Sequence, residues 1–199
     1  ESAAVIEPLA VGLHAVRVAE MKAGQRVLIT GGGPVGLAVA LWARFLGARD
    51  VVVSEFAEKR RELATQLGAT AVIDPSKDLA EQFADATGGE PDMIFECVGV
   101  PGLIQQCVEM APRHCKIVGG GVCEQPDTFM PFLALVKELQ FQFAIAYTRD
   151  DFETVVAMLA QGRIDPSPMI TDVISLEEMP AAFEALRTPS TQCKVLTKF

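Results

Sequence analysis

Short apolar runs and helix-spaced apolar residues alternate along most of the chain. The runs are rich in Val and Ile and stop at glycine or a polar residue, which is typical of parallel strands buried on both faces. They lie at residues 26–30, 51–53, 71–73, 93–96 and 116–118. Helical spacing predicts helices at 8–21, 37–46, 58–67, 79–87 and 103–110. Strands and helices that alternate with short connections indicate an α/β fold built on a doubly wound parallel sheet.

Residues 139–147 follow a different pattern, in which bulky side chains alternate with small or polar ones at a period of two. This pattern predicts a strand near the edge of the sheet. The remaining pattern predicts, in order, a helix at 152–161, a proline-rich break at 165–168, a short strand, a helix at 176–186 and a last strand at 194–199.

Composition narrows the classes of partner. The chain has 199 residues, half of them apolar, and a formal net charge of −9. This acidic balance argues against a nucleic-acid or anionic-membrane partner, because both attract clustered Lys and Arg. No apolar run reaches the roughly 18 residues of a membrane span, and the start lacks the basic and apolar regions of a signal peptide. The chain opens without Met inside an ordered motif, so we expect it to be a piece of a longer protein.

Cysteine usage favours a reducing compartment. The five cysteines are odd in number and show no CxxC spacing; they are Cys97, Cys107, Cys115, Cys123 and Cys193. Such a pattern suits buried free thiols in a cytoplasmic protein better than a disulfide framework or a zinc knuckle.

Residues 31–36 carry the sharpest motif, GGGPVG, which satisfies G-x-G-x-x-G between a predicted strand and a predicted helix. In a dinucleotide-binding turn, Gly31 would permit the tight turn, Gly33 would let the backbone approach a pyrophosphate, and Gly36 would allow close helix–strand packing. The helix N-terminus would offer its free N–H groups to the phosphates. The alternative is a plain strand–helix turn.

An acidic residue follows the motif at the distance that a dinucleotide site requires. Glu55 stands nineteen residues after Gly36, at the end of the second predicted strand. A carboxylate there accepts hydrogen bonds from a ribose diol and repels a 2′-phosphate, so the sequence favours NAD over NADP. Phe56 follows it where an NADP site more often has a small residue or a cation. Arg60 either lies over the adenosine ribose or is a solvated charge on the helix face.

Six blocks of residues together resemble one family. They are 7–15 (EPLAVGLHA), 31–36, Glu55, 68–69 (GA), 96–99 (ECVG) and 194–195 (KV). Their order is similar to that of the zinc-containing medium-chain dehydrogenases, nearest the polyol, butanediol and threonine dehydrogenase branch. The resemblance implies an NAD-dependent oxidoreductase that transfers hydride between a secondary alcohol or diol and NAD, with a small alcohol or ketone as substrate.

The resemblance also implies a domain organisation. Residues 1–24 would form a connecting helix from a catalytic domain, 25–148 an NAD-binding Rossmann domain, and 149–199 a C-terminal helix and the return segment to the catalytic domain. In the family an N-terminal catalytic domain supplies a cysteine and a histidine to the catalytic zinc, and here neither His14 nor His114 has a nearby cysteine at ligand spacing. We therefore expect no tightly bound zinc and no turnover from this chain alone, although the complete protein would use zinc.

One position of the metal site falls within this chain by resemblance. Glu7 matches an acidic residue at or beside the catalytic zinc, and its carboxylate could ligate the metal or hold a zinc-bound water. It equally suits the first turn of a helix, with Pro8 at the first helical position. His14 lies in the predicted helix and is expected to be a packing residue rather than a metal ligand.

The nicotinamide end of the site carries over less specifically. Pro34 and Val35 match the loop beside the pyrophosphate. The strand ends that line the nicotinamide are matched by Val98, Gly120, Gly121 and Val122, and Ile145 matches the segment under the carboxamide. Sugar-alcohol members of the family have an arginine where this chain has Ala146, so a small diol or simple secondary alcohol fits better than a polyol.

The edge strand 139–147 is where the family dimerises, which implies a homodimer or homotetramer. Two other functions remain open. A zinc-free reductase of the quinone oxidoreductase type shares the dinucleotide fold, although the EPL block and Pro34 argue against it. The second open alternative is a non-catalytic module that binds NAD(H), because a dinucleotide-binding fold does not by itself determine the function.

Overall fold

The computed structural model describes residues 2–186 and 191–198 of the chain. Within them, six strands form a sheet in the order β3-β2-β1-β4-β5-β6, and each neighbouring pair is parallel. The strands are β1 (Arg26–Thr30), β2 (Asp50–Ser54), β3 (Ala71–Ile73), β4 (Met93–Glu96), β5 (Lys116–Gly119) and β6 (Gln140–Phe143). This order is that of a doubly wound dinucleotide-binding sheet, so the predicted fold class is confirmed.

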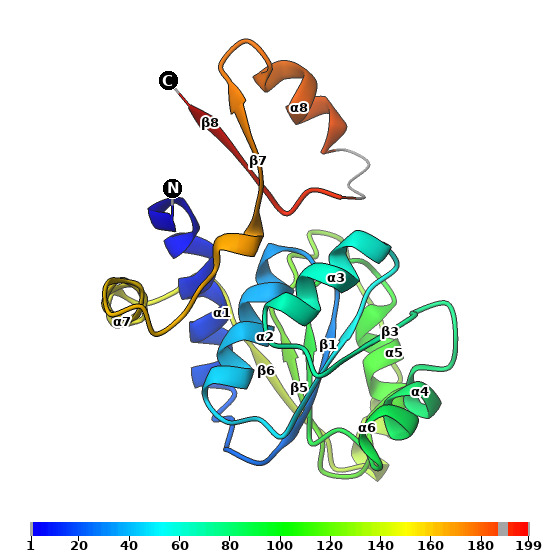
Figure 1. Cartoon of the computed structure of the whole chain (residues 1–199). Helices are drawn as coiled ribbons and strands as arrows, with labels where there is room; N and C mark the ends of the chain where they lie inside the picture. Colours follow the sequence, from blue (N-terminus) through cyan, green and yellow to red (C-terminus); the bar gives the residue numbers. More distant parts are fainter. Residues whose placement is uncertain (1, 187–190, 199) are drawn as a thin grey trace.

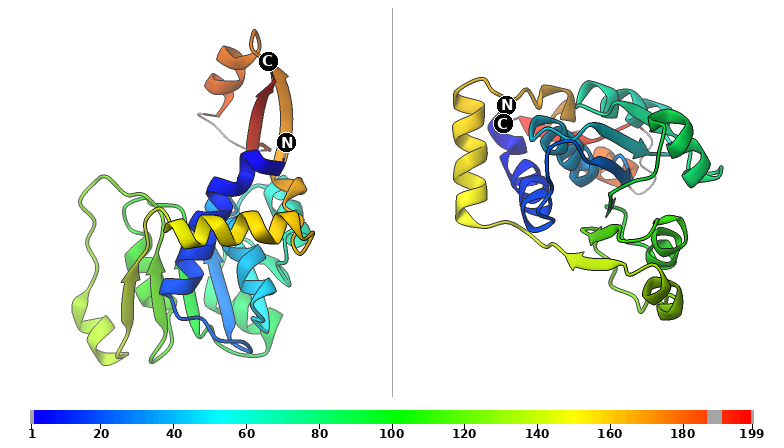
Figure 2. Two further views of the ribbon diagram at one scale, coloured as in Figure 1. Left: turned by 90° about the vertical axis from the view of Figure 1, so that its left-hand side faces the viewer. Right: turned by 90° about the horizontal axis from the view of Figure 1, so that it is seen from below.

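Helices cover both faces of this sheet (Figures 1 and 2). They are α1 (Ile6–Val18), α2 (Pro34–Phe45), α3 (Glu58–Gln66), α4 (Leu79–Thr87), α5 (Leu103–Met110), α6 (Pro131–Val136) and α7 (Arg149–Ala160), with a short 3-10 helix, η1 (Ser2–Val5), before α1. No helix among the described residues is long and apolar enough to cross a membrane.

The alternation of side chains along each strand builds two hydrophobic cores. Val27 and Ile29 of β1 join the core beneath α1 and α2, whereas Leu28 between them joins the core beneath α4 and α5. Both cores contain fully buried residues, which is why β1, β2 and β4 each contain three consecutive apolar residues rather than an alternation of apolar and polar ones. The parallel order brings the carboxyl ends of all six strands to one edge, where ligands of such sheets bind.

Close packing joins α1 to α2. A Cβ atom placed on Gly12 would lie 2.6 Å from the Cβ of Ala38, so the two helix backbones approach each other closely. The indole Nε1 of Trp42 donates to the Leu9 carbonyl at 2.8 Å, and the Trp42 side chain is buried. Helix α1 is therefore part of the body of the molecule.

Helix α7 is held against α1 by a cluster of polar side chains. His14 Nδ1 lies 2.9 Å from Asp151 Oδ2, and Arg17 donates to Asp151 Oδ1 at 2.7 Å. Thr148 caps α7 and shares a capping box with Asp151. Burial alone would raise the pKa of Asp151, but the hydrogen bonds from Thr148, Arg17 and His14 outweigh it and lower the pKa to about 2.

The last segment forms a small unit that projects from the body (Figures 1 and 2). A 3-10 helix, η2 (Ser167–Met169), leads into β7 (Ile170–Ser175), and α8 (Met179–Ala185) then leads to β8 (Lys194–Lys198). Strands β7 and β8 pair in parallel. We call residues 170–186 and 191–198 the arm, and the rest of the described chain the body.

Several boundaries differ from the sequence expectation. The predicted edge strand 139–147 is too long: β6 lies at the sheet edge but ends at Phe143, and Ala146 has a left-handed φ of +55° that ends extended structure. The helix predicted at 8–21 ends at Val18, and Glu20 has a φ of +54°. Helices η1 and α6 have no counterpart among the predicted elements. Residue 199 of the predicted last strand lies outside the described residues.

Candidate functional site

The turn between β1 and α2 is shaped by three of its glycines. Gly31 has a φ of +89°, and its N–H donates to the Ser54 carbonyl at 2.8 Å, which fixes the turn to the end of β2. A Cβ atom on Gly36 would lie 1.9 Å from the Gly31 carbonyl oxygen, so no side chain fits there. Gly33, the N-cap of α2, has nothing within 4 Å of its Cβ direction. The turn is closed toward the protein and open toward solvent.

Glu55 is anchored by the backbone of this turn. Its carboxylate is mostly buried, and Oε2 accepts from the Gly32 N–H at 2.8 Å while Oε1 accepts from the Ala57 N–H at 2.9 Å. Each oxygen retains a second lone pair, so the fixed carboxylate can still accept hydrogen bonds from a diol. The sequence placed Glu55 near the glycine turn, and the structure brings the two into direct contact.

Arg60 is not a solvated charge. Its side chain is 15% exposed, and Nη1 lies 3.9 Å from Glu55 Oε2. Its Nη2 and Nε also donate to the main-chain carbonyl of Gln192, at 3.0 and 3.3 Å. Arg60 thus connects the end of β2 with the chain that enters β8.

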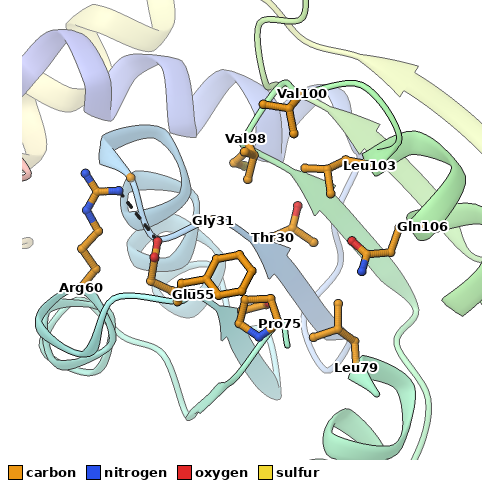
Figure 3. Close-up of a pocket in the computed structure, with 14 residues that line it drawn as sticks. Thr30, Gly31, Glu55, Arg60, Pro75, Leu79, Val98, Val100, Leu103 and Gln106 are labelled. Atoms are coloured by element: carbon orange, nitrogen blue, oxygen red, sulfur yellow. Dashed lines mark ion pairs between the residues drawn. The ribbon is translucent and has the colours of Figure 1, made fainter. Parts of the chain in front are cut away.

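A pocket of about 420 Å³ opens beside the glycine turn. Figure 3 shows Glu55 and Arg60 at one end of it and Leu79 and Gln106 at the other. It is lined by Thr30, Gly31, Gly33, Ser54, Glu55, Phe56, Arg60, Pro75, Leu79, Cys97, Val98, Val100, Leu103 and Gln106. One end is therefore charged and the other largely apolar.

The structure gathers five of the predicted cofactor residues in this lining: Gly31, Gly33, Glu55, Arg60 and Val98. The others lie outside it: Pro34, Val35, Gly36, Gly120, Gly121, Val122 and Ile145. Sequence reasoning missed the apolar end, which is built from Pro75, Leu79, Val100, Leu103 and Gln106. Each of these follows the carboxyl end of a neighbouring parallel strand, which is the one signal that could have found them.

Buried Glu96 organises the neighbouring loops at the ends of β4 and β5. Its Oε1 accepts from the Val98 and Gly99 N–H groups at 2.7 and 2.8 Å. Its carbonyl oxygen accepts from the Gly120 and Gly121 N–H groups at 2.8 and 2.9 Å. Sequence reasoning used Glu96 only as part of a motif, whereas the structure makes it the residue that positions two predicted nicotinamide loops.

The other residues predicted near the nicotinamide are mostly exposed. Val122 and Ile145 are 72% and 81% exposed. Gly121 lines a second cavity of about 300 Å³ with Glu96, Phe129 and Phe143. The described residues therefore do not enclose this end, in contrast to the pocket beside Glu55.

The described cysteines are all free, and their surroundings differ. Cys107, Cys115 and Cys193 are buried, as expected, and burial raises the pKa of Cys107 and Cys115 to about 12. Burial also raises the pKa of the Cys97 thiol, which lines the pocket. The expectation of a buried thiol is wrong for Cys123, which is exposed in the loop after β5.

The candidate metal residues lie apart. Glu7 is exposed in the first turn of α1, and His14 is engaged by Asp151. Across residues 2–186 and 191–198, no three His, Cys, Asp or Glu side chains come together as a group that could hold a metal ion. The residues of this part of the protein do not themselves fit a zinc site.

Comparison with known proteins gives a consistent family. The family model described as zinc-binding dehydrogenase matches residues 34–161. A 2-dehydro-3-deoxy-L-galactonate 5-dehydrogenase from Pseudoalteromonas atlantica is 37% identical, over 90% of this chain and 53% of its own length. The chain spans about half the length of the relatives it matches.

Solved structures of similar proteins have the same fold. The structure of 2R,3R-butanediol dehydrogenase from Bacillus subtilis matches with a TM-score of 0.87 and 32% identity, covering 98% of this chain and 57% of that one. A putative zinc-binding dehydrogenase from Sinorhizobium meliloti, bound to NADP, matches with a TM-score of 0.86 and 33% identity, covering 98% of this chain and 58% of that one. These likenesses extend over the body and the arm together.

Proposed function

The chain belongs to the family of zinc-binding dehydrogenases, and from that premise we propose that its pocket beside Glu55 binds NAD(H), with NAD preferred over NADP. The observation that carries the proposal is the contact between the glycine turn and Glu55. A Gly32 N–H holds the carboxylate at 2.8 Å, at the place where a ribose diol would lie once its phosphate sits on the turn.

The phosphate end of the proposal rests on the geometry of Gly33. The N-terminus of α2 has no side-chain cap, and the space in front of Gly33 is open. Pro34 at the first helical position has no N–H, and the Leu37 N–H donates to the Gly33 carbonyl at 2.9 Å. The N–H groups of Val35 and Gly36 are therefore the ones left for a phosphate. Such groups bind phosphate well, because the helix dipole adds partial positive charge to their hydrogen-bonding capacity.

The preference for NAD rests on the fixed carboxylate. A 2′-phosphate on the ribose would meet Glu55, which two backbone N–H groups prevent from turning away. Arg60 is the nearby cation, but its guanidinium is already committed to the Gln192 carbonyl. The Sinorhizobium meliloti relative is bound to NADP, so family membership does not decide this choice, and the proposal depends on Glu55.

The activity we propose for the complete protein is hydride transfer between a small secondary alcohol or diol and NAD. The bound nicotinamide would supply the hydride acceptor. Within this chain, Glu96 fixes the loops that carry Val98, Gly120 and Gly121, which would line the nicotinamide with Val35, Val122 and Ile145. Ala146 offers no cation to a sugar hydroxyl, which favours a small diol over a polyol.

Glu7 is proposed to lie at or beside the catalytic zinc in the complete protein. Its support is the resemblance of the EPL block and the free, exposed carboxylate at the start of α1. The other ligands would come from a domain with the remaining half of the relatives' length. We derive no step through the metal, because the described residues do not build its site.

The sheet edge supports a second proposal about assembly. Strand β6 is the last strand of the sheet, with Phe143 at its end and Ile145 just beyond, both exposed. We propose that residues 139–147 pair with a second copy of the protein, giving a homodimer or homotetramer in the cytoplasm. Analytical ultracentrifugation of wild type and Phe143→Lys tests this, since a charge at the interface should shift the protein to monomers.

Calorimetric titration with NADH and NADPH tests the cofactor proposal. We expect NADH to bind at least about tenfold more tightly than NADPH. Glu55→Gln should narrow this difference, because it removes the charge that repels a 2′-phosphate. Equal or preferred binding of NADPH by the wild type would overturn the role of Glu55.

Two alanine variants separate folding from binding. Gly33→Ala meets no neighbour, so it should leave the melting temperature unchanged and weaken NADH binding by about tenfold or more. Gly36→Ala would place a methyl group 1.9 Å from the Gly31 oxygen and should destabilise the fold itself. Normal NADH binding by Gly33→Ala would show that the phosphates do not approach this turn.

A further inference from the structure

The apolar end of the pocket contains one polar side chain whose role the cofactor motif does not explain. Gln106 lies one turn into α5, and Figure 3 shows its carboxamide directed into the pocket opposite Leu79. Its neighbours in the lining, Pro75, Leu79 and Leu103, carry no polar side-chain atom. Glu55 and Arg60 lie at the other end.

The carboxamide of Gln106 is uncommitted, unlike those of nearby glutamines. Gln105 donates to Glu109 at 2.6 Å and accepts from the Met130 N–H at 2.7 Å. Gln82 donates to the Asp74 carbonyl at 2.8 Å and accepts from the Asp74 N–H at 3.1 Å. The Gln106 side chain makes no hydrogen bond to the described residues, and its backbone N–H donates to the Gly102 carbonyl at 3.0 Å.

Gln106 is partly exposed, so its carboxamide is in contact with water in the free protein. It has two donors and an acceptor, and a ligand that enters the pocket can replace that water. Leu or Met at this position would present the ligand with no hydrogen-bonding group. The structure therefore holds at this point a paired donor and acceptor that is free for a ligand.

The chemistry of this group matches one part of a dinucleotide. If the ribose lies at Glu55 and the phosphates on the glycine turn, the base occupies the apolar end, between Pro75 and Leu79 on one side and Leu103 on the other. Adenine presents its 6-amino donor beside a ring nitrogen acceptor on either of two edges, and a glutamine carboxamide pairs with both atoms at once. We infer that Gln106 reads the 6-amino edge of adenine and makes the pocket specific for this base.

This inference rests on the proposed function and assigns a base-specificity residue to it. The discriminating probe is nicotinamide 1,N6-ethenoadenine dinucleotide, whose extra ring removes both amino hydrogens while ribose, phosphates and nicotinamide stay the same. Binding of this analogue and of NAD is measured for the wild type, Gln106→Leu and a matched control, Gln161→Leu. Gln161 is exposed at the C-terminal end of α7, outside the pocket lining.

The wild type and the control should bind NAD about tenfold more tightly than the etheno analogue. Gln106→Leu should weaken NAD by about fivefold to tenfold and leave the analogue nearly unchanged, so that the ratio of the two affinities approaches one. Leucine retains the volume of the side chain, and an unchanged melting temperature of the variant excludes a folding defect. Gln106→Glu should weaken NAD as well, because it keeps an acceptor but loses the donor to the ring nitrogen.

Two results would overturn the inference, and they are distinguishable from each other. If the wild type binds NAD but Gln106→Leu leaves the ratio unchanged, the carboxamide does not contact the 6-amino edge and only this inference fails. If the wild type binds neither NAD nor the analogue, the proposed cofactor site fails with it.

Discussion

The body and the arm are built from the same local pattern but treat their apolar residues differently. Both consist of parallel strands joined through helices. In the body, adjacent residues of β2 are fully buried on opposite faces of the sheet: Val53 in the core beneath α1 and α2, and Val52 in the core beneath α4 and α5. In the arm, α8 has no buried residue, and Phe183 is 73% exposed. A strand–helix–strand pattern thus fixes local structure, but a second packed layer is what produces a core.

The contacts between the described residues of the arm and the body lie mainly at the base of the arm. Met169, just before β7, and Cys193, just before β8, are buried in the core beneath α1 and α2. Arg60 adds hydrogen bonds to the Gln192 carbonyl. Beyond these points the apolar side chains of α8 gain little from burial, so the stability of the fold should reside in the body.

The strongest test of this contrast compares two phenylalanines. Phe83 of α4 is fully buried, and Phe83→Ala should lower the free energy of unfolding by about 3–5 kcal/mol, through lost burial and the cavity left behind. Phe183→Ala in α8 should change it by less than about 0.5 kcal/mol. Chemical denaturation followed by circular dichroism measures both. A large loss for Phe183→Ala would mean that the arm shares the core of the body.

Asp151 tests the joint between α1 and α7, which precedes the arm. Its pKa of about 2 in the folded protein lies below the ordinary value of 3.8, so the carboxylate contributes stability that is fully present above pH 3.8 and is lost as the pH falls toward 2. Asp151→Asn should lower the free energy of unfolding at pH 7 by about 2 kcal/mol. The difference in the free energy of unfolding between the variant and the wild type should decrease as the pH falls from 3.8 toward 2.

The matched control for this change is Asp150→Asn. Asp150 accepts a hydrogen bond from the same arginine, Arg17, but its side chain is 81% exposed, so this ion pair contributes little to the free energy of unfolding. Denaturation curves from pH 7 to pH 2 for the three proteins provide the measurement. If the difference between Asp151→Asn and the wild type stays constant with pH, the carboxylate charge is not what holds α7 to α1.

The same contrast explains how much of the fold the sequence predicts. The elements of the body follow directly from apolar runs and helical spacing, because both faces of β1, β2 and β4 are buried and each of these strands contains an unbroken run of three apolar residues. The hydrophobic pattern predicts strand ends less accurately at the edge of the sheet, where one side of the strand has no neighbouring strand. The period-two pattern of 139–147 continues past the end of β6, because nothing in the pattern records the left-handed turn at Ala146.

The candidate site divides in a similar way. The glycine turn and Glu55 could be predicted from the sequence. A turn in which the backbone comes close to a phosphate requires glycines at fixed positions, and the acidic residue follows them after about twenty residues. The apolar end could not be predicted, because Pro75, Leu79 and Gln106 come from separate segments that only the strand order brings together. Their spacing has no period, and each is ordinary in its own helix or loop.

The smallest effect is expected at Arg60, which lies in the body and forms hydrogen bonds to the described residues of the arm. Its hydrogen bonds to the Gln192 carbonyl tie the entry of β8 to α3 beside Glu55. Arg60→Leu should raise amide hydrogen exchange in residues 191–198 by about fivefold, which corresponds to about 1 kcal/mol of lost local stability, and leave exchange in β1 and β4 unchanged.

Arg61→Leu is the matched control, because Arg61 lies next along α3 and its guanidinium makes no hydrogen bond to the described part of the arm. Mass spectrometry of peptides covering 191–198 separates the two variants. If Arg60→Leu speeds exchange in the body as well, then the arm and the body unfold as one unit. If it changes neither, Met169 and Cys193 hold the arm without help from the pocket. An effect confined to the arm would mean that a residue of the proposed ribose site also sets the position of the chain entering β8, so ligand binding at Glu55 and order in the arm would be linked through one guanidinium.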